Sequence, residues 1–335
     1  MKVSRVLFFL LIFVTMLGPL GCAPQTVASS TRRPGPNLEL KPEKTYADLI
    51  VGYAQLGAES EWRAANTISI KETAEKLGVE LRFLDAQQKQ ENQIEAVRKL
   101  IIQKVDVIGI SPIVETGWDE VFQEAKDAGI PIILVDRRAA VSEDLYVSYL
   151  GSDFLEEGRK AARVMAELVN GKANIVELVG TIDSAPANDR FTGFREIIKN
   201  YPEMQIIDSQ SGDFTRARGT EVMSAFLQKY GNKITAVYAH NDDMALGAIQ
   251  AIEEFGLKPG EDIKIVSVDA ARGAFEAMIA GKLNATVECN PLLGPQFFEL
   301  ALKVVNGQPV PKWVPSIESI FFPEDASKIL PTRKY

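Results

Sequence analysis

Short apolar runs alternate with helical segments through most of the sequence, and this alternation limits what the chain can fold into. In the stretch 236–247, an apolar run typical of a strand ends at Asn241 and Asp242, and a helical pattern of small residues follows at once. Asn and Asp are favoured at helix N-termini, so the stretch predicts a buried strand, a short polar turn and a helix. Strands connected in this way form parallel sheets that helices cover on both faces.

The alternation occurs in two cycles, which predicts two lobes. The first cycle begins near Tyr46, and the second starts after Gly151. A chain of 335 residues is also too long for one small hydrophobic core. We therefore predict an α/β fold of two similar Rossmann-like lobes, each built on a parallel sheet. The predicted strands are residues 48–55, 79–86, 105–111, 131–136 and 145–150 in the first cycle, and 174–179, 205–209, 234–239, 263–269 and 285–288 in the second, with a last extended piece at 314–322.

The N-terminus has the features of a secretory signal peptide. Lys2 and Arg5 supply positive charge, and residues 6–17 form an apolar run that is too short to span a membrane comfortably. The stretch 19–22 (PLGC) then resembles a bacterial lipobox, although Pro19 stands where an aliphatic residue is usual.

We predict that residues 1–22 are a signal peptide with a lipobox and that Cys22 is lipidated. The alternative is an ordinary signal peptide cut near Ala23. Residues 23–44 are rich in Pro, Ser, Thr and charge without an apolar period, so we predict a flexible tether there. A tether after the signal favours the lipidated form over the ordinary signal peptide.

The composition argues against several classes of function. The net charge is −8, and nothing in the sequence suggests the basic face that nucleic-acid binding needs. His240 is the single histidine, which we take as structural and which argues against a histidine-based metal site or catalytic triad. Cys22 and Cys289 are the two cysteines, and Cys289 is expected to be an inert buried thiol. No G-x-G-x-x-G turn or P-loop is present, so we expect no cofactor and no metal.

Polar and aromatic residues gather where the predicted strands end. They are Glu59, Trp62, Arg63, Asp136, Arg137, Asp189, Arg190, Phe214, Asn241, Asp269 and Glu288. Ligands of open α/β sheets bind beyond the carboxyl ends of the strands. Carboxylates accept hydrogen bonds from hydroxyl groups, arginine donates them, and asparagine does both. Aromatic faces cover the C–H face of a sugar ring, so the set predicts a site for a neutral polyol.

Each of these residues also has a purely structural interpretation. Asp136 and Arg137 would form an ion pair within a loop. Asn241 and Asp269 would cap the segments that follow them, and Trp62 would face the core. The shared position of so many of them at the ends of strands favours a binding site over these separate roles.

Five longer stretches connect the sequence to a known family. They are GAESEWRAANT at 57–67, QQKQENQIEAVRKLI at 87–101, SPIVETGWDEVFQEAKDAGIP at 111–131, SQSGDFTRARG at 209–219 and YAHNDDMALGAIQAI at 238–252. Through them, residues 48–325 resemble the periplasmic sugar-binding proteins of bacterial ABC importers, of the ribose/galactose type, and most of all their galactofuranose-binding branch.

The resemblance implies two lobes that are joined by three crossovers and enclose a sugar between them. The N-terminal lobe would be residues 45–151 plus 290–312, and the C-terminal lobe 152–289 plus 313–335. The candidate residues other than Asp189 then fall on sugar-contact positions of the family, with Glu59 a feature of the subgroup alone.

The expected function is that of a solute receptor and not of an enzyme. Such a receptor encloses a monosaccharide, galactofuranose or another pentose or hexose, and delivers it to an ABC permease in the membrane. We expect a monomer in the periplasm or at the cell surface, anchored through Cys22.

Three alternatives remain open at this point. A sensor subunit that feeds a membrane kinase or chemoreceptor would share the binding chemistry. A sugar-responsive repressor would need a DNA-binding module where residues 1–44 supply a signal and a spacer. A glycosidase would pair Asp136 with Asp269 or Glu288, but we expect the neighbouring arginines to hold both carboxylates ionised, which argues against a general acid.

Overall fold

The computed structural model describes residues 42–335. The predicted signal peptide, Cys22 and residues 23–41 of the predicted tether lie outside the described residues. Within the described part, no helix has the length and apolar character needed to cross a membrane.

The first lobe is built on a six-stranded sheet with the strand order β11-β5-β4-β3-β1-β2. Its strands are β1 (Ile50–Gln55), β2 (Glu80–Asp85), β3 (Val107–Ile110), β4 (Ile132–Val135), β5 (Ser148–Gly151) and β11 (Trp313–Pro315), and its helices are α1 (Glu61–Leu77), α2 (Gln90–Ile102), α3 (Asp119–Asp127) and α9 (Gly294–Val305). Side chains of a strand alternate between the two faces of a sheet. Accordingly, Ile133 and Val135 pack with α1 and α9, while Ile132 and Leu134 pack with α2 and α3.

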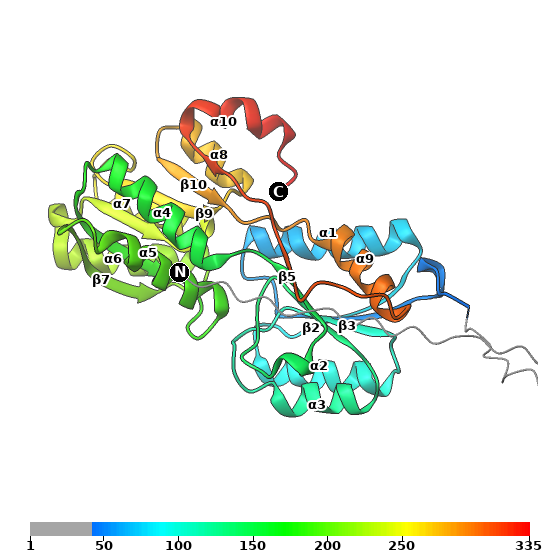
Figure 1. Ribbon diagram of the computed structural model, residues 1–335. Helices are drawn as coiled ribbons and strands as arrows, with labels where there is room; N and C mark the ends of the chain where they lie inside the picture. The colour runs from blue at the N-terminus through cyan, green and yellow to red at the C-terminus, as the bar shows by residue number, and fades with distance from the viewer. Residues whose placement is uncertain (1–41) are drawn as a thin grey trace, which may run out of the picture. The chain divides into compact units, whose positions relative to one another are not determined.

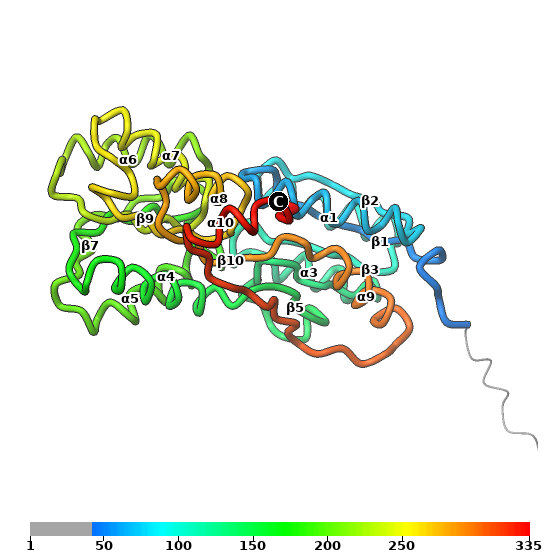
Figure 2. The backbone as a smooth tube through the Cα atoms, turned by 90° about the horizontal axis from the view of Figure 1, so that it is seen from above, coloured from blue at the N-terminus to red at the C-terminus, as the bar shows by residue number. Residues whose placement is uncertain are grey.

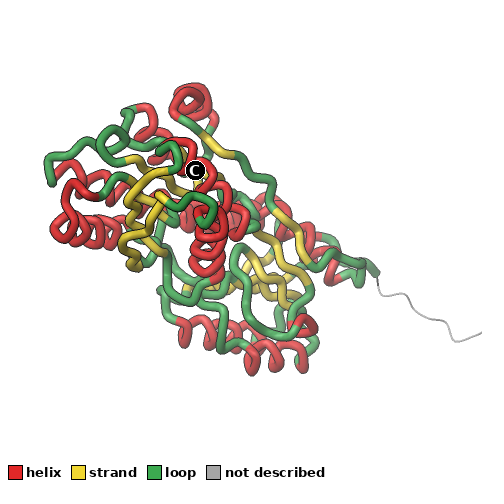
Figure 3. Tube along the Cα trace, turned by 60° about the vertical axis from the view of Figure 1, so that its left-hand side comes forward, coloured by secondary structure: helices red, strands yellow, loops and turns green. Residues whose placement is uncertain are grey.

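The second lobe is built on another six-stranded sheet, with the order β12-β10-β9-β8-β6-β7. Its strands are β6 (Lys172–Val179), β7 (Glu203–Ser211), β8 (Ala236–Ala239), β9 (Lys264–Asp269), β10 (Ala285–Glu288) and β12 (Ile320–Phe321), and its helices are α4 (Phe154–Leu168), α5 (Ala185–Ile198), α6 (Arg216–Tyr230), α7 (Asp242–Glu254), α8 (Arg272–Ile279) and α10 (Pro323–Ile329). Figure 3 shows the strands of the described part flanked by helices.

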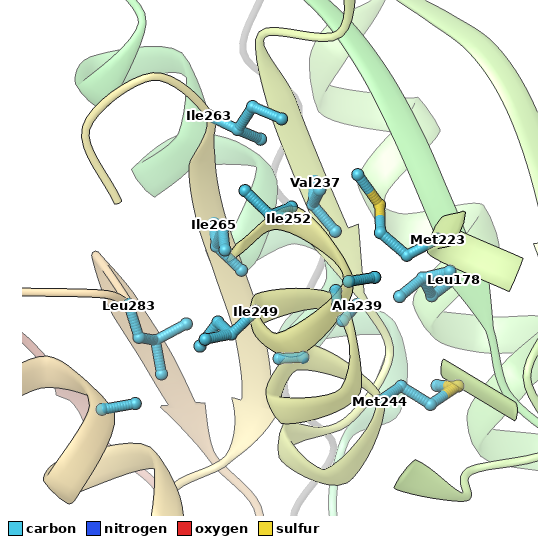
Figure 4. Packing of buried hydrophobic residues seen from close by; sticks show 14 of the residues in the cluster. Leu178, Met223, Val237, Ala239, Met244, Ile249, Ile252, Ile263, Ile265 and Leu283 are labelled. Atoms are coloured by element: carbon cyan, nitrogen blue, oxygen red, sulfur yellow. The ribbon is translucent and has the colours of Figure 1, made fainter. Parts of the chain in front are cut away.

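The core of the second lobe illustrates why these apolar runs become strands. Val237 and Ile265 from two neighbouring strands meet Ile249 and Ile252 of α7 in one buried cluster, together with Met223 of α6 (Figure 4). On the other face of the same sheet, a separate cluster is formed with α4 and α5. The strands are therefore buried on both sides, which requires the continuous apolar runs seen in the sequence.

The predicted α/β architecture of two lobes with parallel sheets is confirmed, with two corrections. The pairing of β12 with β10 is antiparallel, unlike the other strand pairings of the two sheets. The segment predicted as one extended piece at 314–322 is divided between the sheets, because β11 pairs with β5 and β12 pairs with β10. Residues 313–315 thus belong to the first sheet, and the predicted boundary after residue 312 falls three residues too early.

The chain passes from one sheet to the other three times. The crossings follow β5, β10 and β11, and Figures 1 and 2 show them as the green, orange and red segments between the two groups of elements. The start of the crossing after β11 is held to the end of β5, because the indole Nε1 of Trp313 in β11 donates to the carbonyl of Gly151 at 3.0 Å.

Candidate binding site

A cavity between the two lobes is lined by the segments that follow the strand ends. The lining residues are Glu59, Ser60, Trp62, Arg63, Asp136 and Arg137 from the first lobe, and Phe154, Pro186, Arg190, Phe214, Asn241, Asp269 and Cys289 from the second lobe and its crossing. The sequence-predicted set is therefore brought together here, except for Asp189 and Glu288. The cavity volume is about 20 Å³, which leaves room for about one water molecule.

The first turn of α1 positions one group of these side chains. Ser60 is the N-cap of the helix, and its hydroxyl accepts from the backbone N–H of Arg63 at 3.1 Å. This cap fixes the direction in which α1 leaves β1 and so directs Glu59, Trp62 and Arg63 toward the cavity.

Backbone strain accompanies several other lining residues. The φ angles of Asp136, Phe214 and Asp269 are 64°, 60° and 123°, in a region that non-glycine residues rarely adopt. Such strain persists only where the surrounding structure imposes it, and it concentrates at binding and catalytic sites.

The first lobe contributes a buried network of two acids and two arginines. Glu59 Oε1 accepts from Arg63 Nε at 3.2 Å and from Arg137 Nη2 at 3.1 Å. Arg63 Nη2 donates to Asp136 Oδ2 at 2.5 Å, and Arg137 Nη1 donates to the carbonyl of Ile113 at 3.2 Å. These four charged side chains are at most 5% exposed, so their pairs are held in a low-dielectric environment.

Three polar atoms of this network are buried without a hydrogen-bond partner among residues 42–335. They are Glu59 Oε2, Arg63 Nη1 and Arg137 Nε. Nearly all buried polar groups of folded proteins are hydrogen-bonded, so each exception needs an explanation. One acceptor and two donors at the same cavity are what a ligand with hydroxyl groups requires.

The charges of the network change the proton affinities of its members. Burial alone would raise the pKa of Glu59, but Arg63 and Arg137 outweigh it and lower that pKa. Burial lowers the pKa of Arg137 to about 10, and the positive charge of Arg63 contributes to the lowering. At neutral pH the acid is therefore ionised and both arginines are charged.

The second lobe presents Arg190 of α5. Its Nε donates to Glu157 Oε2 at 2.7 Å, and its Nη1 donates to the carbonyl of His240 at 2.5 Å. Its Nη2 lies 3.5 Å from Asp269 Oδ1. His240 itself is fully buried, with Nε2 3.2 Å from Glu177 Oε1, in agreement with the structural role predicted for it.

Asp269 corrects the expectation that arginines would keep the candidate acids ionised. Burial raises the pKa of Asp269 well above its ordinary value, and Arg190 opposes this rise. The negative charges of Asp242 and Glu157 add to the effect of burial, so the pKa of Asp269 stays high. The other buried carboxylates come from distant parts of the chain, and together with burial they outweigh the arginine.

Two aromatic side chains face the cavity from different lobes. Trp62 lies with its ring centroid 4.6 Å from Arg63 Cζ, and its Nε1 donates to the carbonyl of Cys289 at 2.6 Å. Phe214 is 3% exposed, and its ring centroid lies 5.2 Å from Arg137 Cζ. Trp62 also packs against the core of the second lobe, so its core-facing and cavity-lining interpretations both apply.

Asn241 serves two structural purposes at the cavity wall. Its Oδ1 accepts from the N–H of Met244 at 3.0 Å and so caps α7, as the sequence predicted. Its Nδ2 donates to the carbonyl of Phe214 at 3.0 Å and holds the strained loop. One lone pair and one N–H remain for a ligand.

Asp189 and Glu288 are not lining residues of the cavity. Asp189 Oδ2 accepts from Arg138 Nη2 of the other lobe, where both side chains are partly exposed. Glu288 Oε1 contacts the C-terminal segment instead. This oxygen lies 2.8 Å from Arg333 Nη1 and accepts a hydrogen bond from the Tyr335 hydroxyl at 2.9 Å.

The structure adds four lining residues that the sequence reasoning did not name as a site. They are Ser60, Phe154, Pro186 and Cys289. Ser60 had a recognisable signal, because it precedes a helical pattern as an N-cap. Phe154 and Pro186 look like ordinary core and helix-start residues. Cys289 was expected to be inert, and burial raises the pKa of its thiol well above the ordinary value.

This chain has the architecture of a solute-binding protein, with two lobes, three crossings between them and a polar cavity enclosed by both. A family model described as a periplasmic binding protein domain matches residues 51–309. The chain belongs to this family of periplasmic binding proteins, so the resemblance inferred from the sequence is confirmed.

Relatives place the chain more closely within the family. The galactofuranose-binding protein YtfQ of Escherichia coli (strain K12) is 47% identical over 293 residues, which cover 86% of this chain and 92% of that protein. A Mycobacterium smegmatis protein solved in complex with β-D-fucofuranose superposes with a TM-score of 0.84 at 52% identity, covering 86% and 95% of the two chains.

A third relative is the binding protein of the arabinose ABC transporter from Shewanella sp. ANA-3, solved with α- and β-L-arabinofuranose. It superposes with a TM-score of 0.83 at 46% identity, covering 85% of this chain and 95% of that one.

Proposed function

We propose that this chain is the substrate-binding protein of an ABC importer and that it binds a monosaccharide in its furanose form in the cavity between the lobes. The observation that carries the proposal is the group of unpaired buried atoms, Glu59 Oε2, Arg63 Nη1 and Arg137 Nε, among residues 42–335. Burying polar groups without partners is costly, and sugar hydroxyls both donate and accept. The furanose form is supported by the fucofuranose and arabinofuranose bound to two relatives.

Binding would combine polar contacts with ring packing. Glu59, Arg63 and Arg137 supply charged partners from one lobe, and Arg190 supplies one from the other, beside the carboxyl group of Asp269. Trp62 and Phe214 lie against the apolar face of the ring. A sugar with a misplaced hydroxyl leaves one of these groups unpaired, which gives selectivity among stereoisomers.

Entry of the sugar requires the lobes to separate. The charged side chains of the first lobe that line the cavity are at most 5% exposed, so a sugar reaches them only when the walls move apart. The three crossings are the segments about which the lobes rotate, as in hinge closure of two-lobed receptors. The closed and loaded form is then recognised by the permease, outside the cytoplasm, with the receptor as a monomer.

The sugar is bound and released without a reaction. One relative is named as a ribose import binding protein and another as the binding protein of an arabinose ABC transporter, which favours transport over a sensing role or a glycosidase. Product analysis after titration of the protein with sugars tests this part of the proposal, because conversion of any bound sugar would contradict it.

Thermal shift and calorimetric titration of residues 43–335 against a panel of pentoses and hexoses test the proposal. The panel includes galactose and arabinose, which equilibrate with furanose forms. A ligand at about 100 times its dissociation constant stabilises the native state by about 2.7 kcal/mol. We expect such a shift with one or two sugars in the wild type, and its loss in Arg190→Ala.

Arg218→Ala is the matched control, because Arg218 is exposed and pairs within its own helix. A shift that survives Arg190→Ala, or no shift with any sugar, would overturn the proposed site or the proposed ligand class.

We further propose that Cys22 is lipidated and anchors the receptor to a membrane. The support is the lipobox-like stretch 19–22 and the tether-like composition of 23–44. Cys22→Ser should move the protein from the membrane fraction to the soluble fraction. A variant that stays in the membrane fraction would contradict the anchor.

A further inference from the structure

One side chain connects the three crossings between the lobes. Glu318 lies in the crossing after β11, and its Oε1 accepts from the Ser152 hydroxyl of the crossing after β5. The same oxygen lies 3.4 Å from the backbone N of Asn290 in the crossing after β10. The Ser152 hydroxyl also lies 3.4 Å from Cys289 Sγ. The hinge is therefore held together at Glu318.

Glu318 is half-buried and faces a fully buried carboxylate, Glu157 of α4. An oxygen of each acid and the Cys289 sulfur all lie within 4.8 Å of one another. Glu157 is 1% exposed, and its Oε2 accepts from Arg190, whereas its Oε1 has no partner among residues 42–335. Two carboxylates this close do not both ionise, because the repulsion in a buried site is too large. A proton on Glu318 supplies the donor that Glu157 Oε1 lacks.

The surrounding charges support this proton. Burial raises the pKa of Glu318 to about 9, and the negative charge of Glu157 adds to the rise. The titratable and charged groups that face the pair of Glu157 and Glu318 are Lys160 on α4, Arg190 on α5, Tyr149 on β5, Tyr238 on β8, Asp269 at the end of β9 and Cys289 after β10. Arg190 balances one of the two acids, and the shared proton balances the other.

We propose that Glu318 is a positioning residue for the binding site, which shares one proton with Glu157 and thereby ties the three crossings together in the closed form. Loss of this proton places a second negative charge beside the pair of Glu157 and Arg190 and separates the crossings. Arg190 lines the cavity, so deprotonation weakens sugar binding. The inference rests on the proposed sugar-binding function for its affinity arm only.

Glu318→Gln tests the proposal, because an amide can donate to Glu157 and accept from Ser152 without titrating. Glu324→Gln is the matched control, since Glu324 is exposed on α10. The unfolded Glu has a pKa of about 4.3, so the folded wild type binds more protons than the unfolded chain up to about pH 9. Wild-type stability without sugar should therefore fall as the pH rises through this window.

We expect a flatter stability profile for Glu318→Gln and a wild-type profile for Glu324→Gln. The dissociation constant of the sugar should rise about tenfold in the wild type at one pH unit above the pKa of Glu318, and much less in Glu318→Gln. Parallel profiles for wild type and Glu318→Gln would overturn the proposal.

Two further measurements keep the proposal testable if Glu318→Gln does not fold. The infrared band of protonated buried carboxyl groups, to which Asp269 also contributes, should be weaker in Glu318→Ala than in the wild type at neutral pH, and an equal band would contradict the shared proton. Stoichiometric zinc that a chelator removes with loss of stability would show that Glu157, Cys289 and Glu318 hold a metal instead. If the stability and infrared results are as expected but no sugar binds at any pH, the proposed function is wrong, whereas the proton shared by Glu318 and Glu157 is still supported.

Discussion

Glu59 contacts both arginines of the buried network in the first lobe, Arg63 and Arg137. One of its oxygens accepts from Arg63 and from Arg137, and the other is buried without a partner among residues 42–335. A carboxylate that joins two cations and still has a free oxygen is able to hold both arginines in place and to accept from a sugar hydroxyl. The second ability distinguishes a ligand contact from a structural ion pair.

Glu59→Gln should weaken sugar binding about 10- to 100-fold, because hydrogen bonds to charged groups contribute about 1.5–3 kcal/mol. The variant keeps the size of the side chain and removes the negative charge that Arg63 and Arg137 stabilise. Calorimetric titration measures the effect, with Glu72→Gln on the exposed face of α1 as the control. An unchanged affinity together with a lower melting temperature would assign Glu59 to the arginines alone.

At the scale of the elements, the strands, the helices and their caps were predictable because they depend on local patterns. The apolar runs become strands buried on both faces, and Asn241 caps α7 as its sequence context indicates. Helix geometry also explains an error. Asp189 and Arg190 are neighbours on α5, and neighbouring helical residues point in different directions, so only Arg190 lines the cavity.

Contacts between distant elements were not predictable from local patterns. A Cβ atom on Gly180, after β6, would lie 2.0 Å from Phe214 Cζ, so the position of that cavity-facing ring depends on a glycine far away in sequence. Glu288 ends a strand as predicted, but the C-terminal Arg333 and Tyr335 occupy its carboxylate. The pairing of β11 with β5 likewise joins segments more than 150 residues apart along the chain.

At the scale of the whole receptor, the lobes are also joined by charged contacts outside the cavity. Arg216 Nη2 of the second lobe lies 2.8 Å from Glu61 Oε1 of the first, and Arg138 of the first lobe pairs with Asp189 of the second. The Glu61 N–H donates to Asp243 Oδ2 at 2.7 Å across the same gap. Separation of the lobes would break these contacts, so they favour the closed arrangement.

A monosaccharide has no net charge, so any effect of salt on its affinity must come from the protein. Partly exposed ion pairs contribute about 0.2–1 kcal/mol each, and salt screens them. If the pairs of Arg138 and Arg216 stabilise the closed form, raising the salt from about 0.05 M to about 0.5 M should weaken sugar binding a few-fold, because affinity falls with the population of that form.

Arg138→Gln combined with Arg216→Gln should weaken binding at low salt and remove most of this salt dependence, as measured by calorimetric titration. Arg218→Gln is the control, since Arg218 pairs with Glu221 inside α6 and does not join the lobes. The same salt dependence in the double variant and in the wild type would mean that the contacts do not contribute to closure. Closure would then be driven by the sugar and by the contacts at the cavity alone.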